Sequence, residues 1–591
     1  MPTEPLTTQQ IIASSETVGD IVIDWDVPIA MDDGIVIRAD VFRPRGEDRY
    51  PALFSYGPYA KGLTWDAGVY GDQWRALTTE HPEVLEGSTG RYLSWEVADP
   101  EKWVPDGYAL VRADSRGAGR SQGFLDPFGP REHEDMYECI EWTAQQPWCT
   151  GRVGMAGISY YAITQWYAAA RQPPHLAAIC PWEGAGDFYR ECTHHGGIPG
   201  TFFGNWVDWQ LEYVQHGRGE RGLRNPNNGE LVSGPPTLSD EELAANRREV
   251  RELMRTTPLI SEFHRERSVD WTNVRVPLLS CGSWGGHGLH LRGNLTGFEE
   301  AASRHRWLEI HGLEHWTHFY TDYGRQLQKR FFDHFLKGDN NGWDDQPRVQ
   351  LQIRHIDGFV QRAEQEWPLA RTRWTKLFLH PDESALRHAP GPETRQASFR
   401  ALEEHLAFHT APFGHETEIT GPVAAKLFVS SSTSDADLFV VVHLFDPDGR
   451  EVLFAGSVEP RAPIAQGWLR ASHRALDPDL TRPYRPYHPH DRIEPLEPGG
   501  VYELDVEIWP TSIVIPAGYT LGLSVRGTDY EHPVEQDTGV STVQLTMRGS
   551  GPFLHDDPGS RPASVYGGTT TVYGGGENAS YLLVPVIPRA A

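Results

Sequence analysis

Ser159 stands where an apolar segment meets a helical pattern, a setting in which a serine can act as a nucleophile. The segment Gly154–Ile158 leads into it, and apolar residues then recur at helical spacing, namely Ile163, Trp166, Tyr167 and Ala170. A serine on a sharp turn between strand and helix exposes its hydroxyl for attack on an acyl group. Gly157 leaves room for such a turn, although Tyr161 stands where a second glycine usually closes the motif. The alternative interpretation is a buried serine in an ordinary strand–helix turn.

The elements around Ser159 alternate between strands and helices, which predicts a largely parallel sheet. Candidate strands lie at 21–25, 35–42, 51–56, 108–114, 176–182, 276–282 and 306–311, and candidate helices at 132–145 and 323–336. The alternation stops between about 187 and 269, where Ser239–Glu242 forms a capping-box pattern that opens a helix through about Met254. We interpret this segment as a helical cap over the sheet, with an ordinary surface excursion as the alternative.

After about Asn341 the sequence changes to short β patterns separated by Gly, Pro and Asp turns. Strands are expected at 349–353, 375–379, 424–429, 438–444, 502–508, 519–525 and 580–586. Asp446–Gly449 is a hairpin-type turn. This region therefore predicts a β-sandwich or jelly roll.

Composition limits the partners and the compartment. A chain of 591 residues is too long for one core, and its formal charge of −28 argues against nucleic acid and anionic membranes. The five cysteines form no CxxC pattern and cannot all pair within one chain, which favours reduced thiols and a cytoplasmic protein. The polar start Met1–Pro5 lacks the features of a signal peptide. We expect no membrane partner and leave a homodimer open.

Several motifs, taken in order along nearly the whole chain, carry a family resemblance. They are Asp32–Gly34 with Phe42–Pro44, Pro58-Tyr59 with Lys61, Asp114–Gly117, Trp148–Met155, Gly157–Tyr160, Gly312–His315, Phe331–Gly338, Asp435–Asp437 and Ile513–Gly518. Together they resemble the cocaine esterase and Xaa-Pro dipeptidyl-peptidase group of serine hydrolases, which includes α-amino acid ester hydrolases. In that group Tyr follows the nucleophile, which fits Tyr160 and Tyr161.

The resemblance implies an α/β-hydrolase fold in three parts. The hydrolase domain would comprise residues 1–186 and 270–345, the helical cap residues 187–269, and a C-terminal jelly roll residues 346–591. It also implies cleavage of an ester or amide bond in a small organic substrate through an acyl-enzyme, with no cofactor. Aminopeptidase activity of the Xaa-Pro type and acyl transfer on the same site are alternatives.

Four residues are candidates for the acyl-transfer chemistry. Ser159 would be the nucleophile, and His315, which follows the strand at 307–310, would be the base. The Tyr160 N–H follows the nucleophile and would form part of the oxyanion hole. The family adds a tyrosine hydroxyl, which Tyr59 matches, although Ala60 stands where the family commonly has Asp.

The acid of the expected triad is missing from its usual loop. The family places an Asp after the strand at 278–281, but no Asp or Glu occurs from Trp271 to Phe298. Glu183 is the preferred replacement because it ends the neighbouring strand at 176–182. We therefore expect Glu183 within hydrogen-bond reach of His315, with Asp187, another carboxylate or a Ser–His dyad as alternatives.

Two other classes of function stay open at this stage. Histidines cluster at 194–195, 287, 290, 311 and 315, so a metal-assisted hydrolase is conceivable, although their spacing fits no trusted ligand motif. The missing acid also leaves room for an inactive hydrolase that acts as a binding protein. The sequence does not identify the substrate.

Overall fold

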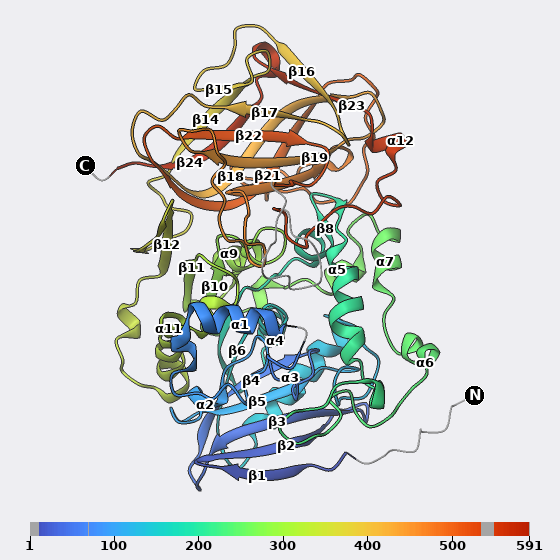
Figure 1. Ribbon diagram of the computed structural model, residues 1–591, viewed down its shortest axis with the longest axis vertical. Helices are drawn as coiled ribbons and strands as arrows, with labels where there is room; N and C mark the ends of the chain where they lie inside the picture. Colours follow the sequence, from blue (N-terminus) through green and yellow to red (C-terminus); the bar gives the residue numbers. More distant parts are fainter. Residues whose placement is uncertain (1–10, 69, 533–548, 590–591) are drawn as a thin grey trace.

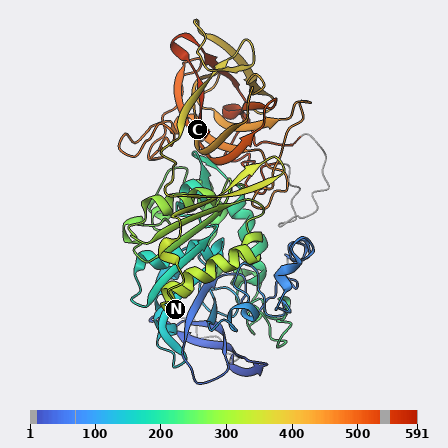
Figure 2. The same cartoon turned by 90° about the vertical axis from the view of Figure 1, so that its left-hand side faces the viewer.

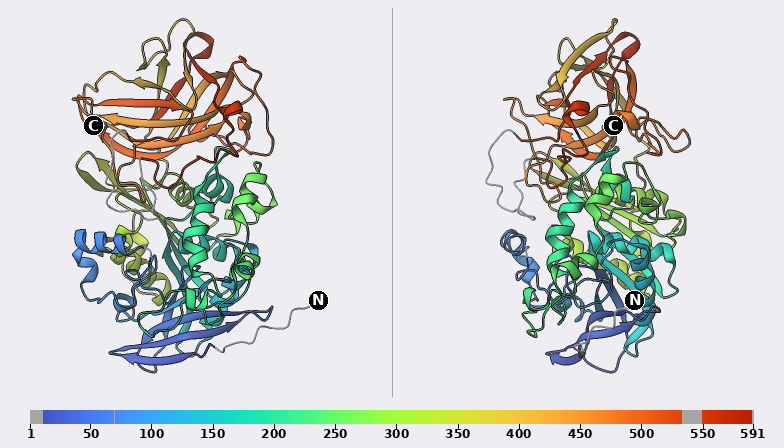
Figure 3. Two further views of the ribbon diagram at one scale, coloured as in Figure 1. Left: turned by 45° about the vertical axis from the view of Figure 1, so that its right-hand side comes forward. Right: turned by 90° about the vertical axis from the view of Figure 1, so that its right-hand side faces the viewer.

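The computed structural model describes residues 11–68, 70–532 and 549–589; the polar start Met1–Pro5 lies outside them. The chain forms a lower α/β part and an upper β part (Figure 1). The two parts stack along the longest axis of the molecule (Figures 2 and 3). Among the described residues, no helix is both long and apolar enough to cross a lipid bilayer.

The lower part is built on one sheet with the strand order β1-β2-β3-β5-β4-β6-β7-β10-β11-β12-β13. Neighbouring strands from β5 through β12 pair in parallel, and β1–β3 and β13 pair antiparallel at the edges. The strands are β1 (Ser14–Val18), β2 (Ile21–Ala30), β3 (Val36–Pro44), β4 (Tyr50–Gly57), β5 (Ala109–Asp114), β6 (Cys149–Ile158), β7 (Leu176–Trp182), β10 (Leu278–Ser283), β11 (Arg306–His311), β12 (Val349–His355) and β13 (Gly358–Glu364). The central strands are almost wholly buried, as expected of a parallel sheet covered on both faces.

Helices cover this sheet and fix the ends of its strands. The main ones are α3 (Pro130–Ala144), α4 (Tyr160–Arg171), α9 (Leu291–Glu300) and α11 (Asp322–Phe332). Helices α3 and α4 pack against each other and against β6. The end of α11 packs closely on β6 at Gly154. A Cβ at Gly154 would lie 2.8 Å from Leu336 and 2.9 Å from Phe332, so only glycine fits there without a shift.

Short helices fill the region between β7 and β10: α5 (Phe202–Trp206), α6 (Asp240–Ala245), α7 (Val250–Thr256) and α8 (Glu262–Arg265). The capping box at Ser239 is confirmed, but the single helix expected through Met254 is two helices. Between them the backbone of Asn246–Arg248 bonds to Leu125 at 2.8–2.9 Å, a long-range contact that interrupts the helix.

The upper part is a second sheet that closes on itself, because β24 pairs with both β14 and β18. Its strands are β14 (Arg373–His380), β15 (Ala385–Arg387), β16 (Arg395–Arg400), β17 (His405–His409), β18 (Thr417–Ser431), β19 (Asp437–Phe445), β20 (Ala465–Arg470), β21 (Tyr502–Ile515), β22 (Thr520–Arg526), β23 (Thr569–Gly574) and β24 (Tyr581–Ile587). Aliphatic side chains fill its core. The expected C-terminal β domain is therefore a closed barrel.

The expected start of the β domain at 346 lies before the first strand of the second sheet. The strand expected at 349–353 exists as β12, but it pairs in parallel with β11 and extends the hydrolase sheet. Its hairpin partner β13 follows it there. The second sheet begins at Arg373.

Candidate active site

Ser159 occupies a strained turn between β6 and α4. Its backbone has φ 57° and ψ −113°, a conformation that costs a non-glycine residue about 1–3 kcal/mol and recurs at functional sites. A Cβ at Gly157 would lie 2.4 Å from Tyr161 Cβ, so glycine is required there. Tyr161 stands where a second glycine usually closes the motif. Gly57 makes room for the Tyr161 ring, because a Cβ at Gly57 would lie 2.6 Å from it.

Hydrogen bonds from two neighbouring segments hold this turn. The Ser159 N–H donates to the carbonyl oxygen of Trp182 at 3.1 Å. The Ile158 N–H donates to the carbonyl oxygen of Glu96 at 3.0 Å, which brings the loop between β4 and β5 beside the serine. The turn is thus fixed by the adjacent strand on one side and by the Glu96 loop on the other.

Ser159 opens into a cavity that it shares with His315. This space, the Ser159 cavity, is also lined by Tyr59, Glu96 and Ser457. A second pocket also contains Ser159 and is otherwise lined almost entirely by apolar and aromatic side chains, namely Tyr59, Phe128, Tyr160, Ile163, Cys192, Phe202, Phe203, Trp206 and Leu289. A polar reaction centre therefore borders an apolar pocket.

His315 follows β11, and both of its ring nitrogens have partners. Nδ1 lies 3.0 Å from the carbonyl oxygen of Ser457, and Nε2 lies 2.8 Å from Glu96 Oε1. Because Nδ1 faces a carbonyl, it must carry a proton to form that bond. Burial lowers the pKa of His315 to about 4, so the ring is neutral at pH 7 and its Nε2 lone pair can accept a proton.

Glu96 is the carboxyl group beside His315, and reasoning from the sequence did not select it. Its side chain is fully buried, its φ is 62°, and its Oε2 atom has no hydrogen-bond partner among the described residues. Burial raises the pKa of Glu96 well above its usual range, and the nearby carboxylate of Glu183 adds to the rise. Because His315 Nδ1 donates to the Ser457 carbonyl, Nε2 accepts the hydrogen bond with Glu96, and the Glu96 carboxyl carries the proton in that bond. Its apolar neighbours Trp95 and Val97 are the signal in the sequence that could have indicated a buried carboxyl.

Tyr59 lies beyond the end of β4 and presents its hydroxyl to the cavity. The Trp206 Nε1–H donates to Tyr59 Oη at 3.2 Å, which leaves the phenol proton available for another acceptor. Burial raises the pKa of Tyr59 well above 10, so the proton stays on the oxygen. Tyr160 is the first residue of α4, and its N–H has no acceptor within the helix.

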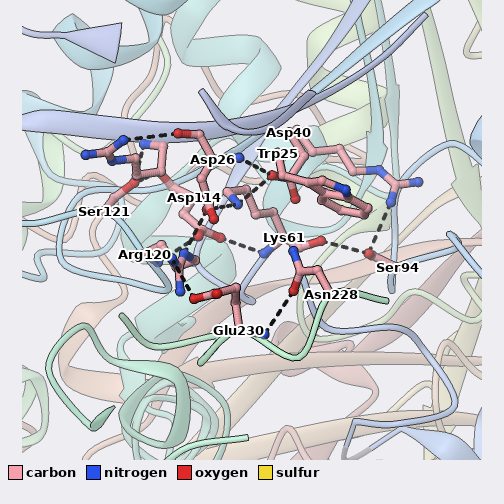
Figure 4. A network of polar contacts seen from close by, with 12 residues as sticks. Trp25, Asp26, Asp40, Lys61, Ser94, Asp114, Arg120, Ser121, Asn228 and Glu230 are labelled. Carbon is pink, nitrogen blue, oxygen red and sulfur yellow. Dashed lines mark hydrogen bonds and ion pairs between the residues drawn. The ribbon is translucent and has the colours of Figure 1, made fainter. Parts of the chain in front are cut away.

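A buried ion network fixes the segment that carries Tyr59 (Figure 4). Lys61 Nζ lies 2.7 Å from both Asp26 and Asp40, and the Lys61 N–H donates to Asp114 at 2.6 Å. Burial opposes the charge on the ammonium group, but Asp40 and Asp26 outweigh it and raise the pKa of Lys61. The Ser94 hydroxyl donates to the carbonyl of Lys61 at 3.1 Å, so the network connects the Tyr59 and Glu96 loops.

Glu183 does not contact His315, which corrects the expectation from the sequence. Its Oε1 atom lies 3.3 Å from Nε2 of His311, and His311 Nδ1 lies 2.7 Å from Glu309. Burial disfavours a charge on this ring, but Glu309 and Glu183 outweigh it and raise the pKa of His311 to about 9. Glu183 thus meets the histidine that ends β11, four residues before His315. Asp187 pairs with Arg190 at 2.6 Å and does not reach His315 either.

The histidines that suggested a metal site have different partners in the structure. His195 pairs with His555 at 2.8 Å, and His287 lies 3.3 Å from the carbonyl of Pro510. His290 lies beside His315, with 5.8 Å between ring centroids. Across the ranges that the structure describes, no group of three or more His, Cys, Asp or Glu side chains is placed to hold a metal ion.

A mainly parallel sheet that presents a serine on a strained turn, beside a neutral histidine, defines a serine hydrolase of the α/β-hydrolase class. Comparison with known proteins gives the family. Residues 33–320 match the X-Pro dipeptidyl-peptidase (S15 family) model, and residues 341–583 match the X-Pro dipeptidyl-peptidase C-terminal non-catalytic domain. The chain belongs to the CocE/NonD family of hydrolases.

Two of its relatives span nearly the whole chain. It is similar to a CocE/NonD family hydrolase from Staphylococcus aureus, with 31% identity, a TM-score of 0.81 and coverage of 96% of this chain and 94% of that one. The cocaine esterase of Rhodococcus sp. is 24% identical over 97% of this chain and all of its own length. A putative Xaa-Pro dipeptidyl-peptidase of Streptomyces avermitilis is 25% identical, with coverage of 75% and 70%.

Proposed function

We propose that this enzyme cleaves small esters or amides through an acyl-enzyme on Ser159, with His315 as the general base. The observation that carries the proposal is that Ser159, on its strained turn, lines the same cavity as His315 and Tyr59. In the first half-reaction His315 Nε2 gives up its hydrogen bond with Glu96, Ser159 Oγ attacks the substrate carbonyl, and the Ser159 proton passes to Nε2. His315 then protonates the leaving alcohol or amine, and the C–O or C–N bond breaks. Water attacks the acyl-enzyme in the second half-reaction, and Ser159 regains its proton.

The apolar pocket supports an uncharged acyl group as the substrate part next to Ser159. Phe128 and Tyr160 stack with 4.2 Å between centroids, and Trp206 lies beside both rings. Burying apolar surface against such rings is favourable, whereas a charged group would lose its hydration there. We therefore expect esters of uncharged aliphatic or aromatic acids to be better substrates than esters of charged acids.

An aminopeptidase of the Xaa-Pro type is the second candidate. Glu96 lines the Ser159 cavity and its Oε2 atom has no hydrogen-bond partner among the described residues, so an ionised Glu96 could pair with a free α-ammonium group. Purified enzyme should be assayed with p-nitrophenyl esters and with Xaa-Pro p-nitroanilides. Ester turnover that Ser159→Ala removes supports the first candidate. Preferential cleavage of the anilides supports the second, and no Ser159-dependent turnover of either set contradicts both.

Tyr59→Phe is expected to lower kcat by roughly 10- to 1000-fold with a smaller change in KM. The phenol proton is needed mainly when the carbonyl oxygen becomes negatively charged, so its loss affects the transition state more than substrate binding. Steady-state kinetics check this. Tyr581→Phe in the barrel is the matched control, and an unchanged kcat for Tyr59→Phe would remove Tyr59 from the oxyanion hole.

Glu96→Gln is expected to alter the pH profile of kcat/KM. An ionised Glu96 stabilises the imidazolium that forms at His315, and a protonated Glu96 does not. Because burial raises the pKa of Glu96, activity should be present above that pKa and fall as the pH drops through it. The Gln variant should be slower and should lack this acidic limb. An unchanged acidic limb in the variant would assign it to another group.

We also propose a cytoplasmic location without nucleic-acid or membrane partners. The support is chemical: all five cysteines are buried free thiols, and the formal charge is −28. Free thiols persist in a reducing compartment, and a strongly acidic protein is repelled by nucleic acid and anionic lipid.

A further inference from the structure

A loop of the C-terminal barrel reaches into the Ser159 cavity. Residues 455–459 lie between β19 and β20, and Ser457 and Val458 line the cavity together with His315. Ser457 is 142 residues from His315 in the sequence. The C-terminal barrel therefore supplies part of the cavity wall around His315, the proposed base.

The main chain of Ser457 makes two hydrogen bonds with His315. Its carbonyl oxygen accepts the His315 backbone N–H at 3.0 Å and lies 3.0 Å from His315 Nδ1. The two donors of one residue thus converge on a single oxygen, which fixes both the position of the backbone and the rotation of the ring. A protonated Nδ1 leaves the lone pair on Nε2, the nitrogen that must accept a proton from the nucleophile.

The barrel loop comes this close because the loop after β10 has no side chain in the way. A Cβ at Gly285 would lie 2.4 Å from Gly456 Cα and 2.6 Å from the carbonyl oxygen of Ala455. The two main chains are also joined by the Ser457 N–H, which donates to the carbonyl of Gly285 at 3.0 Å. The acid-free loop of the hydrolase sheet and the barrel loop are therefore in direct backbone contact.

Glu459 holds the barrel loop from its other side. Its carboxylate is buried and accepts the N–H groups of Gly549 and Arg461, each at 3.0 Å. Its carbonyl oxygen accepts the Gly456 N–H at 2.6 Å. The loop is thus anchored within the barrel as well as against Gly285, so the Ser457 carbonyl has a defined position.

We propose that the Ser457 carbonyl takes the orienting place that a carboxylate holds in a catalytic triad, so that the C-terminal barrel completes the active site. The inference rests on the proposed function, because it assigns a partner to the proposed base. Ser457 is a positioning residue, and its neutral carbonyl selects the tautomer of His315. On the opposite ring nitrogen, Nε2 lies 2.8 Å from the Glu96 carboxyl group.

The direct test measures the protonation of the His315 ring in the intact wild-type enzyme. Long-range ¹H–¹⁵N spectra of histidine-labelled protein should show a ring with protonated Nδ1 and unprotonated Nε2 near pH 7. The signal is assigned by its disappearance in His315→Gln. A His315 ring protonated on Nε2 instead would overturn the proposal, and this result does not depend on how any loop variant folds.

Gly285→Ala tests the contact between the two loops. The added methyl group must displace Gly456, and with it the Ser457 carbonyl, so we expect kcat to fall about 100-fold with little change in KM. The His315 spectrum should also gain the Nε2-protonated form. Gly358→Ala is the matched control, since no atom lies within 4 Å of a Cβ placed there, and it should keep wild-type kcat and spectrum.

The outcomes separate this inference from the proposed function. If Gly285→Ala keeps wild-type kcat while Ser159→Ala is inactive, the Ser457 inference fails and the proposed function stands. If the wild-type enzyme shows no turnover that depends on Ser159, the proposed function itself fails. A folded Gly285→Ala protein that loses kcat, changes its His315 spectrum and still reacts slowly with a serine-directed phosphonate at Ser159 supports both.

Discussion

Replacement of Ser159 by alanine is expected to lower kcat by roughly 10⁴- to 10⁶-fold on any ester that the wild-type enzyme cleaves. Without Oγ no acyl-enzyme forms, and the residual rate reflects water attacking a substrate polarised by the oxyanion hole. The melting temperature should not fall, because Ser159 Oγ makes no hydrogen bond within the described part of the chain and the strained backbone tolerates alanine no worse than serine.

Active-site titration and thermal unfolding check this prediction side by side. A chromogenic ester should give a burst of product equal to the enzyme concentration for the wild type and none for Ser159→Ala. Ser398→Ala, in the barrel strand β16, is the matched control and should keep the full burst. Wild-type turnover in Ser159→Ala would contradict the assignment of the nucleophile.

His315→Gln is expected to have an effect of similar size, roughly 10⁴- to 10⁶-fold on kcat. The amide cannot take the proton of Ser159, although it can fill much of the same space between Glu96 and Ser457. Because Ser159 and His315 act together, the double variant should be no slower than either single variant. Single-turnover kinetics of the acylation step measure this.

His388→Gln, an exposed histidine of the barrel, provides the control for the substitution itself. If His315→Gln retains more than about a tenth of wild-type kcat, another group must deprotonate Ser159. A multiplicative effect in the double variant would likewise show that the two residues do not act in one proton transfer.

The sequence predicted the parts of the fold that depend on local patterns. The buried strands of the parallel sheet read as short apolar runs, and Gly157 before Ser159 marked the turn that the structure confirms. The strand β12 was also predicted, but its place beside β11 in the first sheet was not, because strand pairing is a long-range contact. The break between α6 and α7 has the same origin, in the pairing with Leu125.

The environment of His315 could not be derived from the sequence. Glu183 was chosen because it ends the strand next to the acid-free loop, and it does pair with a histidine, but that histidine is His311 at the end of β11. The actual partners of His315 are Glu96 and Ser457. Both lie in loops without periodic patterns, and Ser457 acts through its main chain, so no side-chain type marks it.

Covalent labelling is the sharpest test of Ser159 as the nucleophile of an acyl-enzyme mechanism. The wild-type enzyme should be treated with a fluorophosphonate, digested and analysed by mass spectrometry. We predict one label per chain, on Ser159 in the peptide that spans the end of β6 and the start of α4. A label on another residue, with Ser159 unmodified in the inactivated enzyme, would contradict the account.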